Sequence, residues 1–119
     1  MGFSIEHFGP EIVGTVFDGE VEIGERFDAL DALDQALGTS SPKAVLVDLS
    51  KASVGHYGAS DALKFANRIN GKQRPLRRVA YVLRPYQADM LATVMSGLHG
   101  PETFRRFEDR DAALAWLRQ

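Results

Sequence analysis

This 119-residue chain has 45% hydrophobic residues, 25% charged residues and a net charge of −2, values that are typical of one folded globular domain. It contains no cysteine, which excludes disulfides, a thiol nucleophile and thiolate metal ligands. No stretch approaches the roughly 20 apolar residues that span a bilayer, and no secretory signal is visible, so we expect a cytoplasmic protein without a transmembrane segment.

The N-terminal part of the chain predicts two strands joined by a tight turn. Residues 3–8 and 11–17 are rich in β-branched and aromatic side chains, and the pair Asp18-Gly19 is expected to end the second strand. Gly14 inside that strand indicates a bulge or the close approach of another backbone.

Residues 22–37 predict an amphipathic helix. Apolar side chains recur there at spacings of three and four residues, and Gly38 is a natural C-cap. The opposite face is acidic, which is typical of a solvated surface. The side chains expected to face inward are Ile23, Phe27, Leu30, Leu33 and Leu37.

The segment Ala44–Ser50 is the most informative part of the chain. Its run of apolar residues, with β-branched Val45 and Val47, predicts a strand that is buried on both faces, as in parallel sheets covered by helices. Asp48 is expected at the C-terminal end of this strand, where open α/β sheets usually bind their ligands.

The remaining elements complete the predicted order β-β-α-β-α-β-α-β-α. Because strands and helices alternate after an initial hairpin, we expect a single α/β domain over residues 1–119 with a mixed, mostly parallel sheet. The further strands are predicted at 77–84 and 103–107, and the further helices at 59–70, 86–98 and 110–117.

This order, together with Val-Leu-Val-Asp-Leu-Ser at residues 45–50, resembles the STAS superfamily, which includes bacterial anti-sigma-factor antagonists and the cytoplasmic domains of sulfate transporters. Residues 107–117, Phe-Glu-Asp-Arg-Asp-Ala-Ala-Leu-Ala-Trp-Leu, look more specifically like the stand-alone SpoIIAA-like subgroup. The resemblance implies a STAS-like fold and a non-enzymatic regulatory module that binds a protein partner through the loop and helix start near residues 56–61.

The sequence departs from the signalling members of that superfamily at the same helix start. Those members carry Asp-Ser-Ser-Gly-Leu there, and one serine is phosphorylated to switch partner binding. This chain has His-Tyr-Gly-Ala-Ser at residues 56–60, with Tyr57 at the serine position and Ser60 displaced into the helix start. We therefore expect a partner-binding module without the usual phosphoserine switch.

The candidate partner- or anion-binding site joins the buried strand to the helix start. His56 and Asp48 could form a general base and its orienting group, but no nucleophile is fixed by spacing, so catalysis is not expected. Free N–H groups at the helix start could instead hold an anion. The candidate residues are Asp48, Ser50, His56, Tyr57, Gly58, Ser60 and Asp61.

The predicted helix 86–98 supports an alternative function. Its apolar stripe fills the core by default, but methionine is also common on adaptable apolar binding surfaces. The alternative is a carrier or sensor of a small apolar ligand or lipid, held in a cleft under this helix, with peripheral membrane contact as a further option. The candidate ligand contacts are Met90, Leu91, Val94, Met95 and Leu98.

The charge distribution favours self-association over nucleic-acid binding. Residues 1–61 carry 11 acidic and 3 basic residues, whereas residues 62–119 carry 5 acidic and 11 basic residues, an asymmetry compatible with a homodimer. The basic stretch offers Phe65 and Tyr81, which are expected in the core and not on a stacking surface. No cofactor or metal is expected, since the histidines lie in separate segments.

Overall fold

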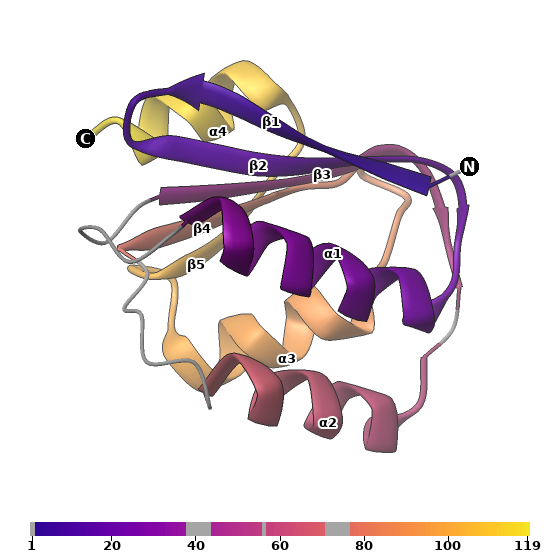
Figure 1. Cartoon of the computed structure of the whole chain (residues 1–119). Coiled ribbons are helices and arrows are strands. Elements are labelled where there is room, and N and C mark those ends of the chain that lie inside the picture. The colour runs from indigo at the N-terminus through magenta and orange to yellow at the C-terminus, as the bar shows by residue number, and fades with distance from the viewer. Residues whose placement is uncertain (1, 38–43, 56, 71–76) are drawn as a thin grey trace.

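The computed structural model describes residues 2–37, 44–55, 57–70 and 77–119, and over these ranges the strands form one five-stranded sheet (Figure 1). The strands lie side by side in chain order, with the first pair antiparallel and all later pairs parallel. The strands are β1 (Gly2–Gly9), β2 (Ile12–Val21), β3 (Ala44–Val54), β4 (Arg78–Val82) and β5 (Phe104–Phe107).

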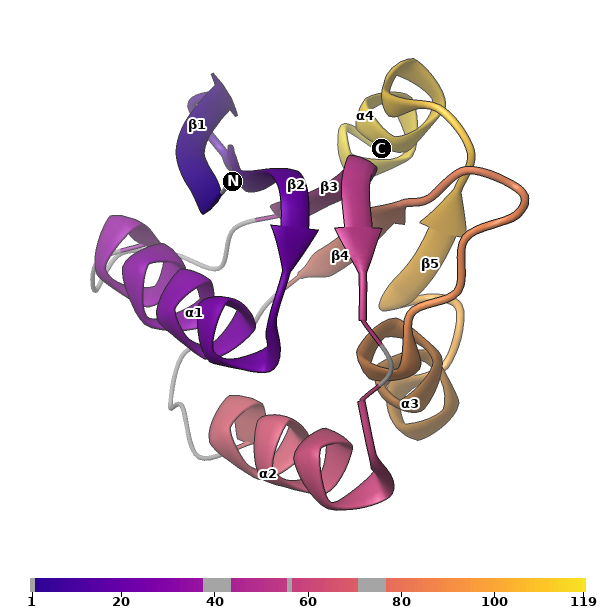
Figure 2. The same ribbon diagram turned by 90° about the vertical axis from the view of Figure 1, so that its right-hand side faces the viewer.

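The helices cover both faces of this sheet. Figure 2 shows α1, α2 and α3 on one side and α4 on the other, which gives three layers. The helices are α1 (Ile23–Leu37), α2 (Ala59–Asn70), α3 (Met90–His99) and α4 (Arg110–Leu117). The predicted order of elements and the mixed, mostly parallel α/β sheet are confirmed. None of the helices in the described ranges is long and apolar enough to cross a membrane.

The strands β2 and β3 extend further than the sequence predicts. Asp18 and Gly19 remain inside β2, because a register shift lets the strand continue its pairing with the C-terminal part of β3. Gly19 has a φ of 75°, in the left-handed region that glycine adopts at little cost. The prediction that Asp18-Gly19 ends the strand is therefore wrong, and Asp48 lies in the middle of β3, not at its end.

The helix predicted at 86–98 begins and ends later in the structure. Asp89 is its N-cap, and the carboxylate accepts a hydrogen bond of 3.1 Å from the N–H of Ala92. The residues between Pro85 and Asp89 lie outside the helix, so α3 spans Met90–His99. The side chain of Asp89, a strong N-cap, sets this boundary in place of the proline.

The sheet separates two apolar clusters with opposite side-chain directions. Along β3, Leu46 faces α4, whereas Val45 and Leu49 face α1, α2 and α3. Gly14 of β2 has no room for a side chain, because a Cβ atom there would lie 2.7 Å from the carbonyl oxygen of Leu46. The predicted close backbone approach at Gly14 is confirmed.

Candidate functional site

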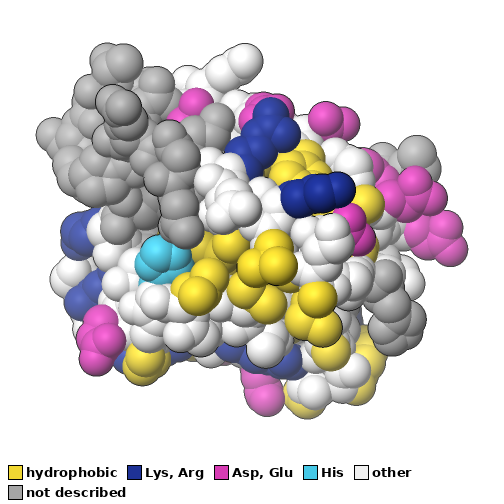
Figure 3. Space-filling model, turned by 90° about the horizontal axis from the view of Figure 1, so that it is seen from below, with side chains coloured by type: hydrophobic (Ala, Val, Ile, Leu, Met, Phe, Trp, Pro, Cys, Tyr) yellow, Lys and Arg dark blue, Asp and Glu magenta, His cyan; other side chains and the backbone are white. Residues whose placement is uncertain are grey.

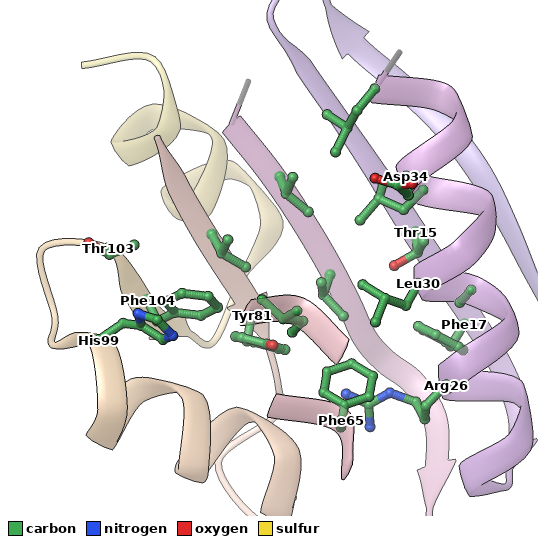
Figure 4. Close-up of a pocket in the computed structure, with 17 residues that line it drawn as sticks. Thr15, Phe17, Arg26, Leu30, Asp34, Phe65, Tyr81, His99, Thr103 and Phe104 are labelled. Carbon is green, nitrogen blue, oxygen red and sulfur yellow. The ribbon is translucent and has the colours of Figure 1, made fainter. Parts of the chain in front are cut away.

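A cavity of about 290 Å³ lies between the sheet and the helices α1, α2 and α3 (Figure 4). Strands β2 to β5 form its floor, while α1, α2 and the end of α3 form its walls. Most of the lining side chains are aliphatic or aromatic. The lining includes Thr15, Phe17, Arg26, Val47, Tyr81 and His99.

The parallel register arranges the cavity floor in rows that cross the strands. In one row Val45 pairs with Val79, and this part of the floor is apolar. In the next row Val47 pairs with Thr15 on one side and with Tyr81 on the other. Two residues with hydroxyl groups therefore flank a valine in an otherwise apolar floor.

The cavity is closed at one end and borders solvent at the other. Phe17 and Arg26 at the closed end are 1% and 2% exposed. At the other end His99 is exposed and Thr103 is half-buried. The ring of His99 stacks on Phe104, with 4.9 Å between the centroids, so it forms part of the rim.

A buried ion pair lies beside the closed end of the cavity. Arg26 of α1 donates hydrogen bonds of 2.7 and 2.9 Å to the two carboxylate oxygens of Asp89, and both side chains are almost fully buried. Burial alone would lower the pKa of Arg26, but the hydrogen bonds and the charge of Asp89 outweigh it and raise that pKa. The guanidinium of Arg26 stays charged, and its hydrogen bonds to Asp89 tie α1 to the start of α3.

Aromatic rings surround the guanidinium of Arg26. Its central carbon lies 5.6 Å from the ring centre of Phe17, 5.8 Å from that of Tyr57 and 5.9 Å from that of Phe65. Such cation–π contacts partly replace the water that the charge loses on burial. The arginine is therefore built into the wall and is not a free cation.

Asp48 and Ser50, two of the predicted site residues, contribute to the contact between β3 and α4. The carboxylate of Asp48 accepts hydrogen bonds from the Ser50 N–H (2.9 Å) and hydroxyl (2.7 Å), and from Arg110 Nε (2.9 Å) and Nη2 (2.7 Å). Burial alone would raise the pKa of Asp48, but these hydrogen bonds lower it. His56, the predicted general base that Asp48 would orient, lies outside the described residues.

The remaining partner-site candidates lie at the start of α2. Tyr57 is buried, and its hydroxyl donates a 2.9 Å hydrogen bond to the carbonyl oxygen of Val21. Burial raises the pKa of this hydroxyl. Gly58 and Ser60 are exposed, and Asp61 is half-buried. The structure thus places Tyr57 in the core and leaves only its neighbours accessible to a partner.

The α3 residues predicted to contact an apolar ligand fall into two groups. Leu91 and Met95 are buried, whereas Met90 and Leu98 are exposed and Val94 is half-buried. In the described structure these side chains do not line the 290 Å³ cavity, which lies beside the C-terminal end of α3. Hydrophobic side chains gather on the surface that α2 and α3 form, next to a histidine (Figure 3). As ligand contacts the α3 residues stay a prediction.

A wider crevice of about 640 Å³ lies at the C-terminal edge of the sheet. The end of β3 lines it together with the loop before α3, and it contains Tyr57 and Met90, one residue from each candidate group. Tyr86 also lines it and is 79% exposed. Open α/β sheets commonly bind partners at such edges.

No family model matches this sequence, and none of the curated proteins matches it. A similar solved structure is that of an uncharacterized protein from the DUF3478 family with a SpoIIAA-like fold, from Shewanella loihica PV-4. The two chains are 24% identical, the match covers 98% of this chain and 93% of the other, and the TM-score is 0.61. This likeness shows that the chain has a SpoIIAA-like fold, as the resemblance to the STAS superfamily implied.

Proposed function

We propose that this protein is a non-enzymatic binding protein that carries or senses a small, largely apolar molecule in the cavity between the sheet and α1, α2 and α3. The cavity itself is the observation that supports this proposal. Ligand pockets are typically apolar spaces of roughly 300–1,000 Å³ with a few placed polar groups. A volume of about 290 Å³ is at the lower end of that range, which favours a small ligand.

The composition of the cavity lining supports the same function. Protein interiors are normally close-packed, and water does not fill an apolar space well because it finds few hydrogen-bond partners there. The floor carries Val45, Val47 and Val79, whose side chains are apolar and short. An apolar ligand would supply the missing contacts.

Native mass spectrometry of the full chain, purified without detergent, tests this function directly. We expect a retained molecule or the uptake of an added apolar compound such as naphthalene. Val47→Phe places a large side chain on the cavity floor and should abolish uptake, whereas Leu63→Phe, at an exposed position of α2 outside the cavity, should not. Equal uptake by the parent and both variants would contradict the proposal.

A second candidate function is a protein-interaction module that uses the start of α2 and the adjoining crevice. The exposed ring of Tyr86 in the 640 Å³ crevice supports it, since large aromatic side chains are frequent anchors in interfaces. In this case a protein partner should bind the parent chain in a fixed stoichiometry, and Ser60→Arg should no longer bind it. Asn67→Arg, at an exposed position later in α2, is the matched control. Equal retention by both variants would contradict the module.

A further inference from the structure

The hydroxyl groups of Thr15 and Tyr81 are the distinctive polar feature of the cavity. Both residues are deeply buried, with 2% and 3% exposure, yet neither hydroxyl has a hydrogen-bond partner among the described residues. No fully enclosed polar side-chain atom in the described structure lacks a partner, so these oxygens must border the open space of the cavity. Figure 4 shows both side chains rising from the floor between α1 and α3.

The position of these hydroxyls is fixed by the sheet. Thr15 and Tyr81 both belong to the row that crosses the strands at Val47. Strands are about 4.8 Å apart, so the two backbones lie roughly 10 Å apart on either side of the valine. The side chain of Tyr81 is longer than that of Thr15, and its hydroxyl interacts electrostatically with Arg26 and Asp89, so it lies toward the closed end of the cavity.

A hydroxyl that borders the cavity and has no described protein partner can hydrogen-bond to a ligand atom. Each hydroxyl can donate one hydrogen bond and accept others. Burial raises the pKa of Tyr81, so its hydroxyl stays protonated and neutral at physiological pH. Both groups can therefore bind a neutral hydroxyl or carbonyl oxygen.

We infer that the ligand is an uncharged, largely apolar molecule with a hydroxyl or carbonyl group that hydrogen-bonds to Thr15 and Tyr81. This inference rests on the proposed function and specifies the chemical class of its ligand. The apolar part lies against Val45 and Val79, and the polar group lies toward Thr15 and Tyr81.

The charges around the cavity favour a neutral ligand over an acid. Within the described lining, the buried cation is Arg26, and both of its terminal nitrogens already bind Asp89. A carboxylate in the cavity would lose its hydration and would have to compete with Asp89 for that arginine. Neutral hydroxyls alone compensate a carboxylate poorly, so an anionic ligand is disfavoured.

Matched naphthalene derivatives test this inference by fluorescence titration of the full chain at neutral pH. The probes are naphthalene, 2-naphthol and 2-naphthoate, which share one apolar body. Thr15→Val and Tyr81→Phe should each weaken 2-naphthol binding by about 2- to 10-fold, the usual worth of one hydrogen bond, and leave naphthalene binding unchanged. The parent should bind 2-naphthoate at least about tenfold more weakly than 2-naphthol.

Tyr86→Phe is the matched control, because it removes an exposed hydroxyl outside this cavity and should leave all three affinities unchanged. Equal effects of Thr15→Val and Tyr81→Phe on naphthalene and 2-naphthol, or tighter binding of 2-naphthoate, would overturn the inference but leave the proposed function in place. If the parent binds none of the three probes, both are overturned.

The thermal stability of the two variants gives an independent measurement. Each variant removes a hydroxyl that has no described partner and keeps the shape of the side chain, so the melting temperature should stay the same or rise. A clear fall for either variant would show that its hydroxyl is hydrogen-bonded inside the fold, and would overturn the inference even if binding could not be compared.

Discussion

The two faces of the sheet differ in how closely they are packed. On the α4 face, Leu46 and Leu117 are completely buried, and the backbone at Gly14 leaves no space for a Cβ atom. On the opposite face, the helices α1, α2 and α3 leave a space of about 290 Å³ above the half-buried Val47. Both faces bury an apolar cluster, and the face covered by α1, α2 and α3 leaves a cavity beside its cluster.

Each face also has an arginine–aspartate pair, and the two pairs differ in burial. Arg26 and Asp89 are 2% and 0% exposed in their side chains, whereas Arg110 is 36% exposed beside Asp48, which is 4% exposed. Solvent can therefore replace Arg110 as a partner far more easily than it can replace Arg26. We therefore expect that breaking the Arg26–Asp89 pair lowers the unfolding free energy more than breaking the Arg110–Asp48 pair.

The largest effect is expected from Arg26→Met, which leaves the carboxylate of Asp89 buried without its partner. Breaking a buried ion pair in this way typically costs about 3–5 kcal/mol of unfolding free energy, measured by urea denaturation. Adding Asp89→Asn should recover part of the loss, because the amide is uncharged and still caps α3. A loss under about 1 kcal/mol in the single variant would mean that the pair is hydrated in solution.

Leu46→Ala is the next largest change, because it opens a cavity on the closely packed face. The side chain is 0% exposed in the central strand, and such truncations cost roughly 2–5 kcal/mol. Calorimetry or urea denaturation of the variant measures the loss. A cost below about 1 kcal/mol would show that the α4 face can relax around the gap, and the two faces would then differ less than the structure indicates.

The sequence predicts the α4 face better than the face that contains the cavity. The buried strand around Leu46 and the helix 110–117 follow from local patterns, and the structure contains them. Local spacing works here because each element depends on the pattern of one segment, and the glycine inside the strand signals the close approach at Gly14.

The face that contains the cavity could not be predicted in the same way, because its features combine distant segments. Arg26 and Asp89 are 63 residues apart, and Thr15 and Tyr81 become neighbours of one space only through Val47. Whether a cavity forms depends on the sizes of side chains from several elements, and no single sequence motif records that combination. One signal was available: Arg26 lies three residues before Ala29, on the buried stripe of α1.

Asp48→Asn tests the more exposed ion pair and should show a pH dependence. The pKa of Asp48 is lowered in the folded protein, so its contribution is complete above the ordinary carboxyl pKa of about 3.9 and is lost as the pH falls through the lower folded pKa. We expect the variant to lose about 1–3 kcal/mol at pH 7, and the difference from the parent to shrink below about pH 4.

Melting temperatures between pH 7 and pH 2 measure this dependence. Asp28→Asn, at an exposed position of α1, is the matched control and should follow the parent at every pH. A difference between Asp48→Asn and the parent that stays constant down to pH 2 would show that the carboxylate of Asp48 is not the group stabilised by Ser50 and Arg110.

The smallest expected effect, from Val47→Ala, gives the sharpest test of the two faces. Val47 borders the cavity, so its methyl groups have few protein atoms to lose contact with, and truncation should cost about 1 kcal/mol or less. Val82→Ala makes the same chemical change on the α4 face at a side chain that is 1% exposed, and should cost about 2 kcal/mol. Because the two variants remove the same atoms, the difference in unfolding free energy reports packing alone. Equal costs would mean that the space above Val47 is closed in solution, and the cavity could then hold no ligand.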